Sequence, residues 1–429
     1  MRASREINPW FWVPTLYAAE GLPYVLVITV SVIMYKRLGI PNAQIAFATS
    51  LLYLPWVIKP LWGPAVDLIR AKRGVVVTLQ FLLCAAIAVL AFSLQWSALS
   101  TATLVAFWLI AFASATHDIA ADGLYILGLS VHQQAAYVGV RSTFYRVAMI
   151  AGQGGLVIVA GKLEARWGGS VAPAWSATLG MVAVLFLCLG IYHTFVLPNP
   201  MPERVKERGS AAREFFHILI LFFRKKGMPA TIAFLLLYRF AEAQLIKLVP
   251  PFLLDPRAVG GLGLSTEEVG IVYGSVGVAA LILGGLLGGY VVSRHGLRLW
   301  LWPMACALHL PDAVFVYLSR TQPTNLSLIG SAIAIEQFGY GFGLTAYALV
   351  MIAVSEGEHA TAHYALCTGI MALGMLVPGM LSGSLQELMG YNGFFLWILA
   401  AAIPGFAVTA LIKVDPGFGS KGKEMAVSS

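Results

Sequence analysis

Long apolar stretches constrain the fold of this 429-residue chain more than any other feature. A stretch of about 20 apolar residues is long enough to cross the hydrocarbon core of a bilayer as a helix. Charged residues make up 11% of the chain, whereas a soluble domain has about 25%. The sequence therefore predicts an all-α membrane protein with twelve transmembrane helices. We expect these helices near residues 10–35, 43–69, 74–97, 102–130, 134–161, 171–197, 229–253, 266–293, 297–319, 326–354, 360–386 and 390–413.

The distribution of Lys and Arg predicts the orientation of the chain. Cytoplasmic loops of membrane proteins carry an excess of basic residues over the loops outside. With the N-terminus inside, 17 Lys and Arg lie in cytoplasmic segments, 6 lie outside and the other five of the 28 lie within spans. Both termini and the long middle loop are therefore expected in the cytoplasm. The net charge of +8 then reflects orientation in the membrane and does not indicate nucleic-acid binding.

The spans fall into two groups of six. We expect an N-terminal six-helix bundle over residues 1–197, a cytoplasmic linker over 198–228, and a C-terminal six-helix bundle with a short cytoplasmic tail over 229–429. Apolar residues recur at helical spacing over 211–223, which predicts an amphipathic helix along the membrane surface. The 6+6 arrangement indicates an internal repeat with pseudo-two-fold symmetry.

Ionisable residues in the fourth and fifth spans form the densest polar cluster. They are His117, Asp118 and Asp122 in one span and Arg141, Tyr145 and Arg146 in the other. Asp118 and Asp122 are four residues apart and share one helix face. If the chain turns near residue 132, Asp122 lies level with Arg141 and Asp118 with Arg146. A structural charge clamp formed by these four residues is one interpretation, and a functional site with Asp118 and Asp122 in proton coupling is the other.

A glycine-containing basic turn follows the second span. Gly63, Asp67, Arg70 and Arg73 are its notable residues, and we expect them to form a gating turn. A related turn over residues 288–298 follows the eighth span but has no acidic residue. The first copy resembles the signature turn of the major facilitator superfamily.

Four segments of the N-terminal half narrow this resemblance. They are Glu20 to Pro23, Lys59 to Pro64 with Asp67, Ser114 to Asp122, and Arg141 to Gly155. Together they resemble the AmpG-type muropeptide permeases, a branch of the major facilitator superfamily that is also similar to acetyl-coenzyme A and siderophore permeases. The C-terminal half shares only the architecture. The resemblance implies a proton-driven importer of a bulky polar solute in the bacterial inner membrane. The solute that it implies first is an anhydromuropeptide for cell-wall recycling, with a siderophore or another amphipathic anion as the alternative.

Further ionisable residues lie within the predicted spans. Arg239 and Glu242 are three residues apart and are expected to neutralise each other. Lys59 and Lys247 are expected to extend to the membrane interface. Glu20, Asp312 and Glu336 then have no obvious partner, and burial of such a carboxyl favours its neutral form. In the superfamily arrangement Glu20 and Glu336 would face the central cavity and Asp312 would be peripheral, so Glu20 and Glu336 join Asp118 and Asp122 as proton-coupling candidates. The alternative for each is a neutral acid that bonds to a neighbouring backbone group or tyrosine.

Cations and tyrosines on the cavity-lining spans predict recognition of an anionic, partly sugar-like solute. The candidate substrate-binding residues are Arg239, Glu242, Lys247, Tyr24, Tyr125, Tyr145, Gln153, Gln337 and Tyr340. The four cysteines have neither metal-ligand spacing nor a disulfide pattern, so no metal and no cofactor is expected. Expected partners are a small solute, protons and membrane lipids, with no nucleic acid and with the chain as a monomer. A membrane enzyme and a sensor with a transporter fold are the competing classes. The His117–Asp118 pair is the only feature in favour of the enzyme, and no nucleotide-binding loop or serine nucleophile elbow accompanies it.

Overall fold

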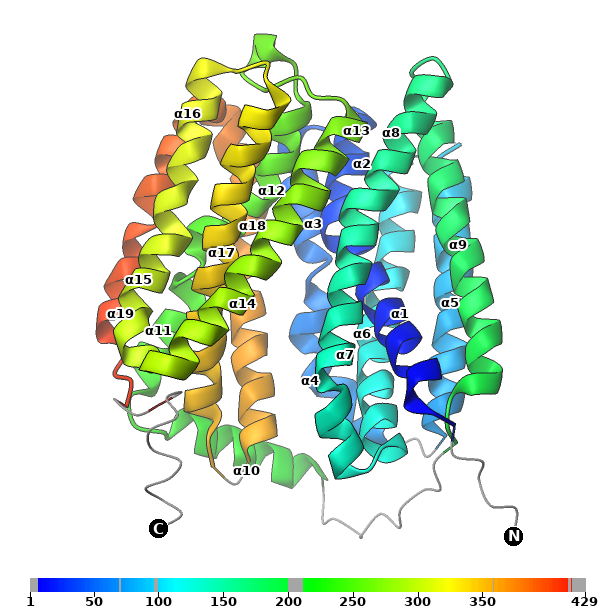
Figure 1. Ribbon diagram of the computed structural model, residues 1–429, viewed down its shortest axis with the longest axis vertical. Coiled ribbons are helices and arrows are strands. Elements are labelled where there is room, and N and C mark those ends of the chain that lie inside the picture. Colours follow the sequence, from blue (N-terminus) through cyan, green and yellow to red (C-terminus); the bar gives the residue numbers. More distant parts are fainter. Residues whose placement is uncertain are drawn as a thin grey trace. The chain divides into compact units, whose positions relative to one another are not determined.

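Helices form every regular element in the part of the chain that this computed structural model describes (Figure 1). The described residues are 7–68, 71–95, 99–199, 211–357, 359–415 and 418. An apolar chain must satisfy its backbone hydrogen bonds within each span, and a helix does so without a partner. The predicted helical class therefore follows directly from the composition.

Nine helical stretches within the described residues are long and apolar enough to cross a membrane. The last of them, Ala362–Leu411, has 50 residues and covers the expected eleventh and twelfth spans. The expected second and seventh spans are each divided into two shorter helices and therefore fall below the length of a full span. With these two, the observed helices account for all twelve expected spans. The nine stretches are Pro9–Arg37, Lys72–Ser93, Thr101–Gly128, His132–Arg166, Val171–Val196, Thr266–His295, Leu297–Thr321, Leu326–Ser355 and Ala362–Leu411.

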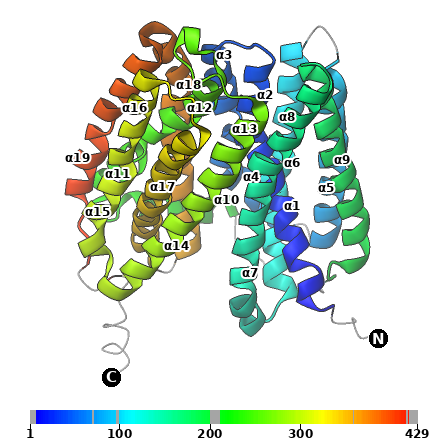
Figure 2. The same ribbon diagram turned by 45° about the horizontal axis from the view of Figure 1, so that its top comes forward.

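The chain divides into two compact units. The N-terminal unit comprises the described residues of 1–39, 52–206 and 266–270. In it α5 packs on α9 and α6, and α1 packs on α7 and α6 (Figure 2). Its elements are η1 (Pro9–Phe11), α1 (Val13–Val25), η2 (Leu26–Val30), α2 (Ser31–Arg37), α4 (Leu54–Leu68), α5 (Lys72–Ser93), α6 (Leu99–Gly128), α7 (Val131–Ile150), η3 (Ala151–Leu156), α8 (Val157–Arg166), α9 (Val171–Val196) and α13 (Thr266–Val269).

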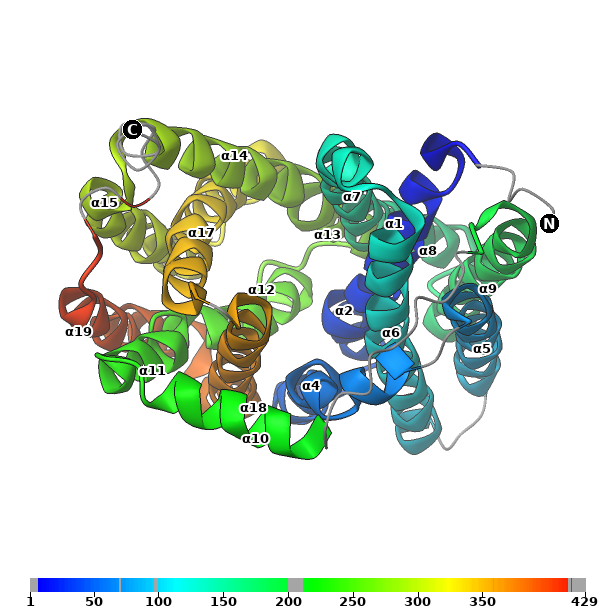
Figure 3. The same ribbon diagram turned by 90° about the horizontal axis from the view of Figure 1, so that it is seen from below.

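The C-terminal unit comprises the described residues of 40–51, 207–265 and 271–429. In it α14 and α15 pack on α17, and α12 packs on α18 (Figure 3). The helix α3 packs on α18 as well. Its elements are α3 (Asn42–Leu51), α10 (Ala211–Phe223), α11 (Met228–Leu237), α12 (Phe240–Leu254), η4 (Arg257–Val259), η5 (Gly270–Gly277), α14 (Val278–His295), α15 (Leu297–His309), η6 (Leu310–Asp312), α16 (Ala313–Thr321), α17 (Leu326–Ser355), α18 (Ala360–Ala401) and α19 (Ile403–Leu411). The helix α3 groups with this unit although it lies early in the chain.

Several spans are discontinuous. The seventh span breaks between α11 and α12 at Tyr238 and Arg239, and the ninth passes through a 3-10 turn, η6, between α15 and α16. Wide π turns interrupt the first, fifth and eighth spans at η2, η3 and η5. Such interruptions are frequent at functional sites of helical membrane proteins.

Glycines bring α14 and α17 into backbone contact. A Cβ atom added to Gly284 would overlap the carbonyl oxygen of Phe338, and one added to Gly341 would overlap that of Leu281. Small residues at a helix–helix interface allow this close approach, which supplies van der Waals packing where lipid provides no hydrophobic driving force.

The connection between the two groups of six spans is only partly described. Residues 200–210 lie outside the described residues, and α10 occupies Ala211–Phe223, the segment expected to be helical. Beyond it, Lys225 donates to the carbonyl oxygens of Val354 at 2.6 Å and Glu356 at 3.0 Å. These bonds satisfy carbonyl groups at the C-terminal end of α17. Partial burial lowers the pKa of Lys225 from its ordinary value.

Candidate functional site

Asp122 on α6 lies at the centre of a polar cluster in the N-terminal unit. Its carboxylate is 2.8 Å from the guanidinium of Arg141 on α7 and accepts a hydrogen bond of 3.0 Å from the hydroxyl of Tyr17 on α1. The guanidinium carbon also lies 4.5 Å from the centre of the Tyr17 ring and 5.6 Å from that of Tyr125. The sequence predicts the approach of Asp122 to Arg141, and the two aromatic neighbours add cation–π attraction to it.

Asp118, one turn earlier on α6, takes its partners from α4. Its carboxylate accepts a hydrogen bond from Trp56 Nε1 at 3.1 Å and lies 3.6 Å from Lys59 Nζ. The expected pairing of Asp118 with Arg146 is therefore wrong. Arg146 follows Arg141 by five residues, which turns it about 140° around α7. The expectation that Lys59 extends to the interface is also wrong, because its ammonium group points at Asp118.

Glu20 on α1 is a buried carboxyl close to these ion pairs. Glu20 is 8% exposed, and its Oε2 has no hydrogen-bond partner among the residues that the structure describes. The next residue, Gly21, packs against the backbone and ring of Tyr145, and a Cβ atom there would lie 2.9 Å from the Tyr145 carbonyl oxygen. Glu20 is thus the acid of this cluster for which the described residues provide no ion pair.

Aromatic side chains lie next to Glu20 in the chain and in space. The hydroxyl of Tyr24 lies 3.1 Å from that of Tyr53, and its ring centre lies 5.3 Å from that of Trp56 and 6.4 Å from that of Tyr145. Tyr24 and Tyr145, two of the candidate substrate-binding residues, are therefore neighbours. Tyr125 instead donates to the Gln134 carbonyl oxygen at 2.6 Å, and Gln153 is buried in η3.

A second group of polar side chains, linked by hydrogen bonds, crosses the interior of this unit. The sequence singles out only one of its members, His117. Gln80 Nε2 lies 3.1 Å from His117 Nε2, and Gln80 Oε1 lies 2.9 Å from His193 Nδ1. The other ring nitrogen of His193 lies 2.9 Å from Thr15 Oγ1. The four residues come from α6, α5, α9 and α1, so helical spacing within one span gives no signal of their contact.

Another buried acid that the sequence did not single out is Glu164 on α8. It pairs with Arg37 at 2.9 Å and accepts hydrogen bonds from Trp175 Nε1 at 2.8 Å and from Thr266 Oγ1 at 2.7 Å. These bonds join α2, α9 and the start of α13 to α8. The ion pair and the two hydrogen bonds account for the burial of the Glu164 carboxylate.

The gating turn is described only in part. Arg70 and the side chain of Asp67 lie outside the described residues. Arg73 donates to the carbonyl oxygen of Thr194, and the neighbouring Lys72 is buried and donates to the Val66 carbonyl oxygen at 2.8 Å. A Cβ atom added to Gly63 would lie 3.8 Å from the side chain of Ile119 on α6.

The C-terminal unit contains two buried cations on α12 or at its start. Arg239 donates to the hydroxyl of Tyr340 on α17 at 2.5 Å, with its guanidinium carbon 5.3 Å from the ring centre. Lys247 is 3% exposed and donates to Thr49 Oγ1 at 3.1 Å. The expectation that Lys247 extends to the interface is wrong, because Thr49 on α3 provides it with a polar partner in the interior.

The charges of Arg239 and Glu242 act on each other, as the sequence predicts, but the two side chains form no direct hydrogen bond. Both carboxyl oxygens of Glu242 are buried without a hydrogen-bond partner in the described part of the chain. Arg239 has φ −107° and ψ 20° and lies at the break before α12. Because the backbone of Arg239 is not helical, the spacing of three residues does not give the direct contact expected within a continuous helix.

Glu242 instead meets two acids from other helices. One carboxyl oxygen from each of Glu242, Asp312 and Glu336 lies within 4.8 Å of the other two, and each of the three residues is 1% exposed. Glu336 Oε2 accepts a hydrogen bond of 3.0 Å from Gln337 Nε2. The expectation that Asp312 is peripheral is wrong, because its side chain is buried next to Glu242 and Glu336.

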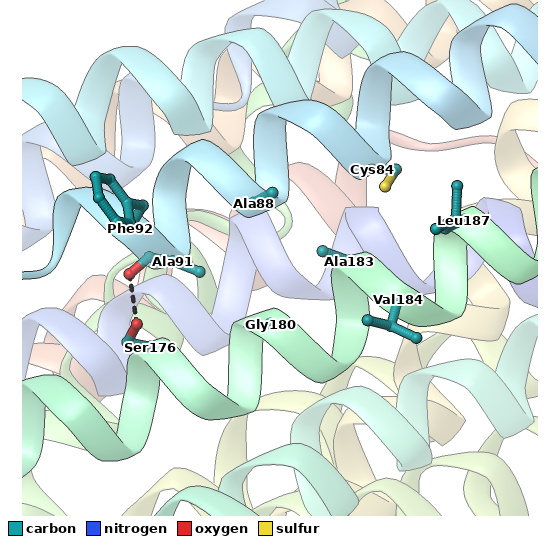
Figure 4. Close-up of a pocket in the computed structure, with 9 residues that line it drawn as sticks. All are labelled: Cys84, Ala88, Ala91, Phe92, Ser176, Gly180, Ala183, Val184 and Leu187. Atoms are coloured by element: carbon teal, nitrogen blue, oxygen red, sulfur yellow. Dashed lines mark hydrogen bonds between the residues drawn. The ribbon is translucent and has the colours of Figure 1, made fainter.

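The hollow drawn in Figure 4 has a different character. It has a volume of about 370 Å³ and is lined mainly by small and apolar side chains of α5 and α9, including Cys84, Gly180 and Leu187. Its serine, Ser176, is already bonded to the Ala91 carbonyl oxygen at 2.7 Å (Figure 4). None of the candidate site residues lines it, so it does not fit a charged or sugar-like solute.

This chain is similar in sequence and in fold to known transport proteins. Residues 16–377 match the sequence profile of the Major Facilitator Superfamily. The chain is 27% identical over 409 residues to the anhydromuropeptide permease of Escherichia coli, covering 90% of this chain and 76% of that protein. It is 24% identical to the putative transporter AmpG 4 of Rickettsia conorii, covering 91% and 92% of the two chains. The crystal structure of the nucleoside transporter NupG is similar with a TM-score of 0.71 at 17% identity, over 94% of this chain and 98% of that one, which shows a shared fold.

Proposed function

This chain belongs to the Major Facilitator Superfamily, and from that premise we propose that it imports an anhydromuropeptide across the inner membrane of a bacterium. The family confirms the predicted twelve-helix fold and the prediction of a transporter instead of an enzyme. The chain is thus a multi-pass membrane transporter of small-molecule solutes. The identity of the solute is the proposal, and two relatives with permease or AmpG names support it.

The observation that carries the choice of solute is the pair of buried cations Arg239 and Lys247. They lie eight residues apart, which is about 12 Å along a helix. Each has a hydroxyl partner, Tyr340 for Arg239 and Thr49 for Lys247. Because an anhydromuropeptide carries several carboxylates on a sugar and peptide frame, two spaced cations with aromatic and hydroxyl neighbours match its chemistry. Tyr24, Tyr145 and Gln337 would add polar contacts in their own units.

Proton coupling is the second part of the proposal, and Glu20 is its carrier. Asp118 and Asp122 already have Lys59 and Arg141 as partners. Protonation of either would break an ion pair, whereas protonation of Glu20 would not. Glu20 therefore gains and loses a proton at the smallest cost to the surrounding structure, and Asp118 and Asp122 serve mainly as the charge clamp.

The remaining parts of the proposal concern topology and assembly. The excess of Lys and Arg in the expected inner segments supports cytoplasmic termini and a cytoplasmic linker containing α10. We further propose that the chain works as a monomer in contact with lipid, since each transporter of this fold encloses its own pathway.

Uptake into proteoliposomes tests the function. Purified protein would be reconstituted, an inward proton gradient imposed, and accumulation of a radiolabelled anhydromuropeptide measured with and without a protonophore. We expect accumulation above the external concentration that the protonophore abolishes. A ferric siderophore serves as the comparison solute. Accumulation of the siderophore alone, or of neither solute, would reject the proposed substrate.

A further inference from the structure

Three acids from three different spans meet in the interior of the C-terminal unit. Glu242 is on α12, Asp312 ends η6 and Glu336 is on α17. One carboxyl oxygen from each acid lies within 4.8 Å of the other two, and all three residues are buried. Both oxygens of Glu242 and both oxygens of Asp312 have no hydrogen-bond partner among the described residues. Buried polar groups of native proteins are nearly always satisfied, so four buried oxygens without a partner on two neighbouring acids indicate a ligand.

Burial and the proximity of the other two acids oppose ionisation of each carboxyl, so a bound cation would be needed for all three to carry a charge. Glu242 lies in the first turn of α12 and Asp312 is the N-cap residue of α16, a helix of nine residues. The N-terminal end of a helix carries a partial positive charge, which stabilises a carboxylate there. Neither acid uses this position for a capping hydrogen bond, because all four of their carboxyl oxygens are without a partner in the described part of the chain. Glu336 accepts a hydrogen bond from the Gln337 amide, which also suits a carboxylate.

The charge balance of the buried groups favours a monovalent cation over a divalent one as the ligand. Among the described residues of this unit, the buried Lys, Arg, Asp and Glu side chains are two cations, Arg239 and Lys247, and these three acids. The buried set therefore has an excess of one negative charge when all five are ionised. One monovalent cation neutralises this excess, whereas a divalent ion would leave an excess of positive charge. A buried excess charge of either sign is costly in a low-dielectric interior.

The backbone near the acids also suits an ion. Glu242 follows the break between α11 and α12, and Asp312 lies in the 3-10 turn between α15 and α16. Discontinuous membrane helices leave carbonyl groups at the ends of their first halves, and transporters coordinate coupling ions such as sodium with groups of this kind. Carboxylate and carbonyl oxygens are hard ligands that match an alkali or alkaline-earth cation.

We propose that Glu242, Asp312 and Glu336 form a binding site for one sodium ion inside the C-terminal unit. The ion allows the three carboxylates to remain ionised side by side and ties α12, η6 and α17 together. The site belongs to the C-terminal unit, whereas Glu20 and the ion pairs of Asp118 and Asp122 belong to the N-terminal unit. Sodium binding therefore goes beyond the proposed proton-coupled import and does not depend on the identity of the solute.

Equilibrium binding of radioactive sodium to the purified full-length protein tests the site in the absence of any solute. Choline chloride would keep the ionic strength constant, and potassium and calcium would be tested as competitors. We expect saturable binding of one sodium ion per chain and a melting temperature several degrees higher in sodium chloride than in choline chloride. Because neither measurement involves transport, a negative result leaves the proposed import untouched, and failure of the import assay leaves the sodium site untouched.

Substitutions identify the ligands. Glu242→Gln, Asp312→Asn and Glu336→Gln should each lower sodium affinity at least tenfold, since each removes one charged ligand. Glu356→Gln is the matched control, because Glu356 is an exposed acid of the same unit and should leave affinity unchanged. The proposal is overturned if the wild-type protein shows no saturable sodium binding, if calcium binds in place of sodium, or if the three variants bind sodium as tightly as the control. The first two outcomes need only wild-type protein and are independent of how well the variants fold.

Discussion

Arg141 lies between the carboxylate of Asp122, 2.8 Å away, and the ring of Tyr17, whose centre is 4.5 Å from the guanidinium carbon. The Tyr17 hydroxyl in turn donates to the same carboxylate at 3.0 Å. Three helices, α7, α6 and α1, therefore meet at one charge pair whose members support each other. This arrangement holds the neighbouring Glu20 segment of α1 in place.

The first prediction concerns this pair. Arg141→Ala or Asp122→Asn should each lower the stability of the purified protein. Both side chains are about one-third exposed, at 33% and 38%, so we expect a loss of about 1 kcal/mol from the ion pair itself. Thermal unfolding of the single variants and of the double variant measures the coupling. Additive losses would show that the two residues do not stabilise the protein through their contact.

The second prediction distinguishes the observed partner of Asp118 from the one that sequence spacing favours. A double-mutant cycle between Asp118→Asn and Lys59→Met should give a coupling of about 0.5–3 kcal/mol, the range for residues in contact. The matched cycle with Arg146→Met should be additive within about 0.5 kcal/mol. Equal coupling in the two cycles would mean that Asp118 does not interact with Lys59 in preference to Arg146.

The third prediction concerns proton coupling. Glu20→Gln keeps the size and hydrogen-bonding ability of the side chain but cannot carry a proton. Gradient-driven accumulation of solute should be lost, whereas exchange of labelled for unlabelled solute across the membrane should continue. Asp255→Asn, in the other unit, is the control and should retain accumulation. Accumulation by Glu20→Gln at the wild-type level would exclude Glu20 as the carrier.

The fourth prediction concerns solute recognition. Arg239→Ala should weaken binding of an anhydromuropeptide at least tenfold, because a bidentate cation for its carboxylate is lost. Arg294 provides a matched control, since its guanidinium carbon lies 4.9 Å from the centre of the Tyr290 ring on the surface of α14. Isothermal titration of both variants checks the difference. Equal affinity of the Arg239 and Arg294 variants would argue against recognition through Arg239.

The fifth prediction tests the close packing of α14 on α17. Gly341→Ala should lower stability by about 1–3 kcal/mol, because the added methyl group overlaps the Leu281 carbonyl oxygen. Gly289→Ala on α14 is the control, since an added Cβ atom there meets nothing within 4 Å. Melting temperatures of the two variants should therefore separate clearly. A Gly341 variant as stable as the control would mean that the helices can move apart at little cost.

The sequence predicts the helical class, the spans and the approach of Asp122 to Arg141, because these depend on composition and on a single antiparallel turn. It fails where a helix is interrupted. The breaks at Arg239 and at Asp312 cannot be located from the prolines, because other prolines, such as Pro23 and Pro303, lie inside continuous helices. Contacts such as Gln80 with His117 and His193 join distant spans, so no spacing within one span reports them.

Two of the wide turns, η2 and η3, lie against each other, and an added Cβ atom on Gly152 of η3 would overlap the side chain of Val25 at the end of α1. A π turn contains one residue more than an α-helical turn would at the same place. Deletion of one residue from Leu26–Val30 would restore a regular helix and rotate the segment beyond it by about 100° relative to α1. Arg37 would then no longer face Glu164. In comparisons among homologous sequences, a gap of one residue in these spans is therefore expected to reorient a whole helical segment, and so to alter more contacts than a substitution at any single position.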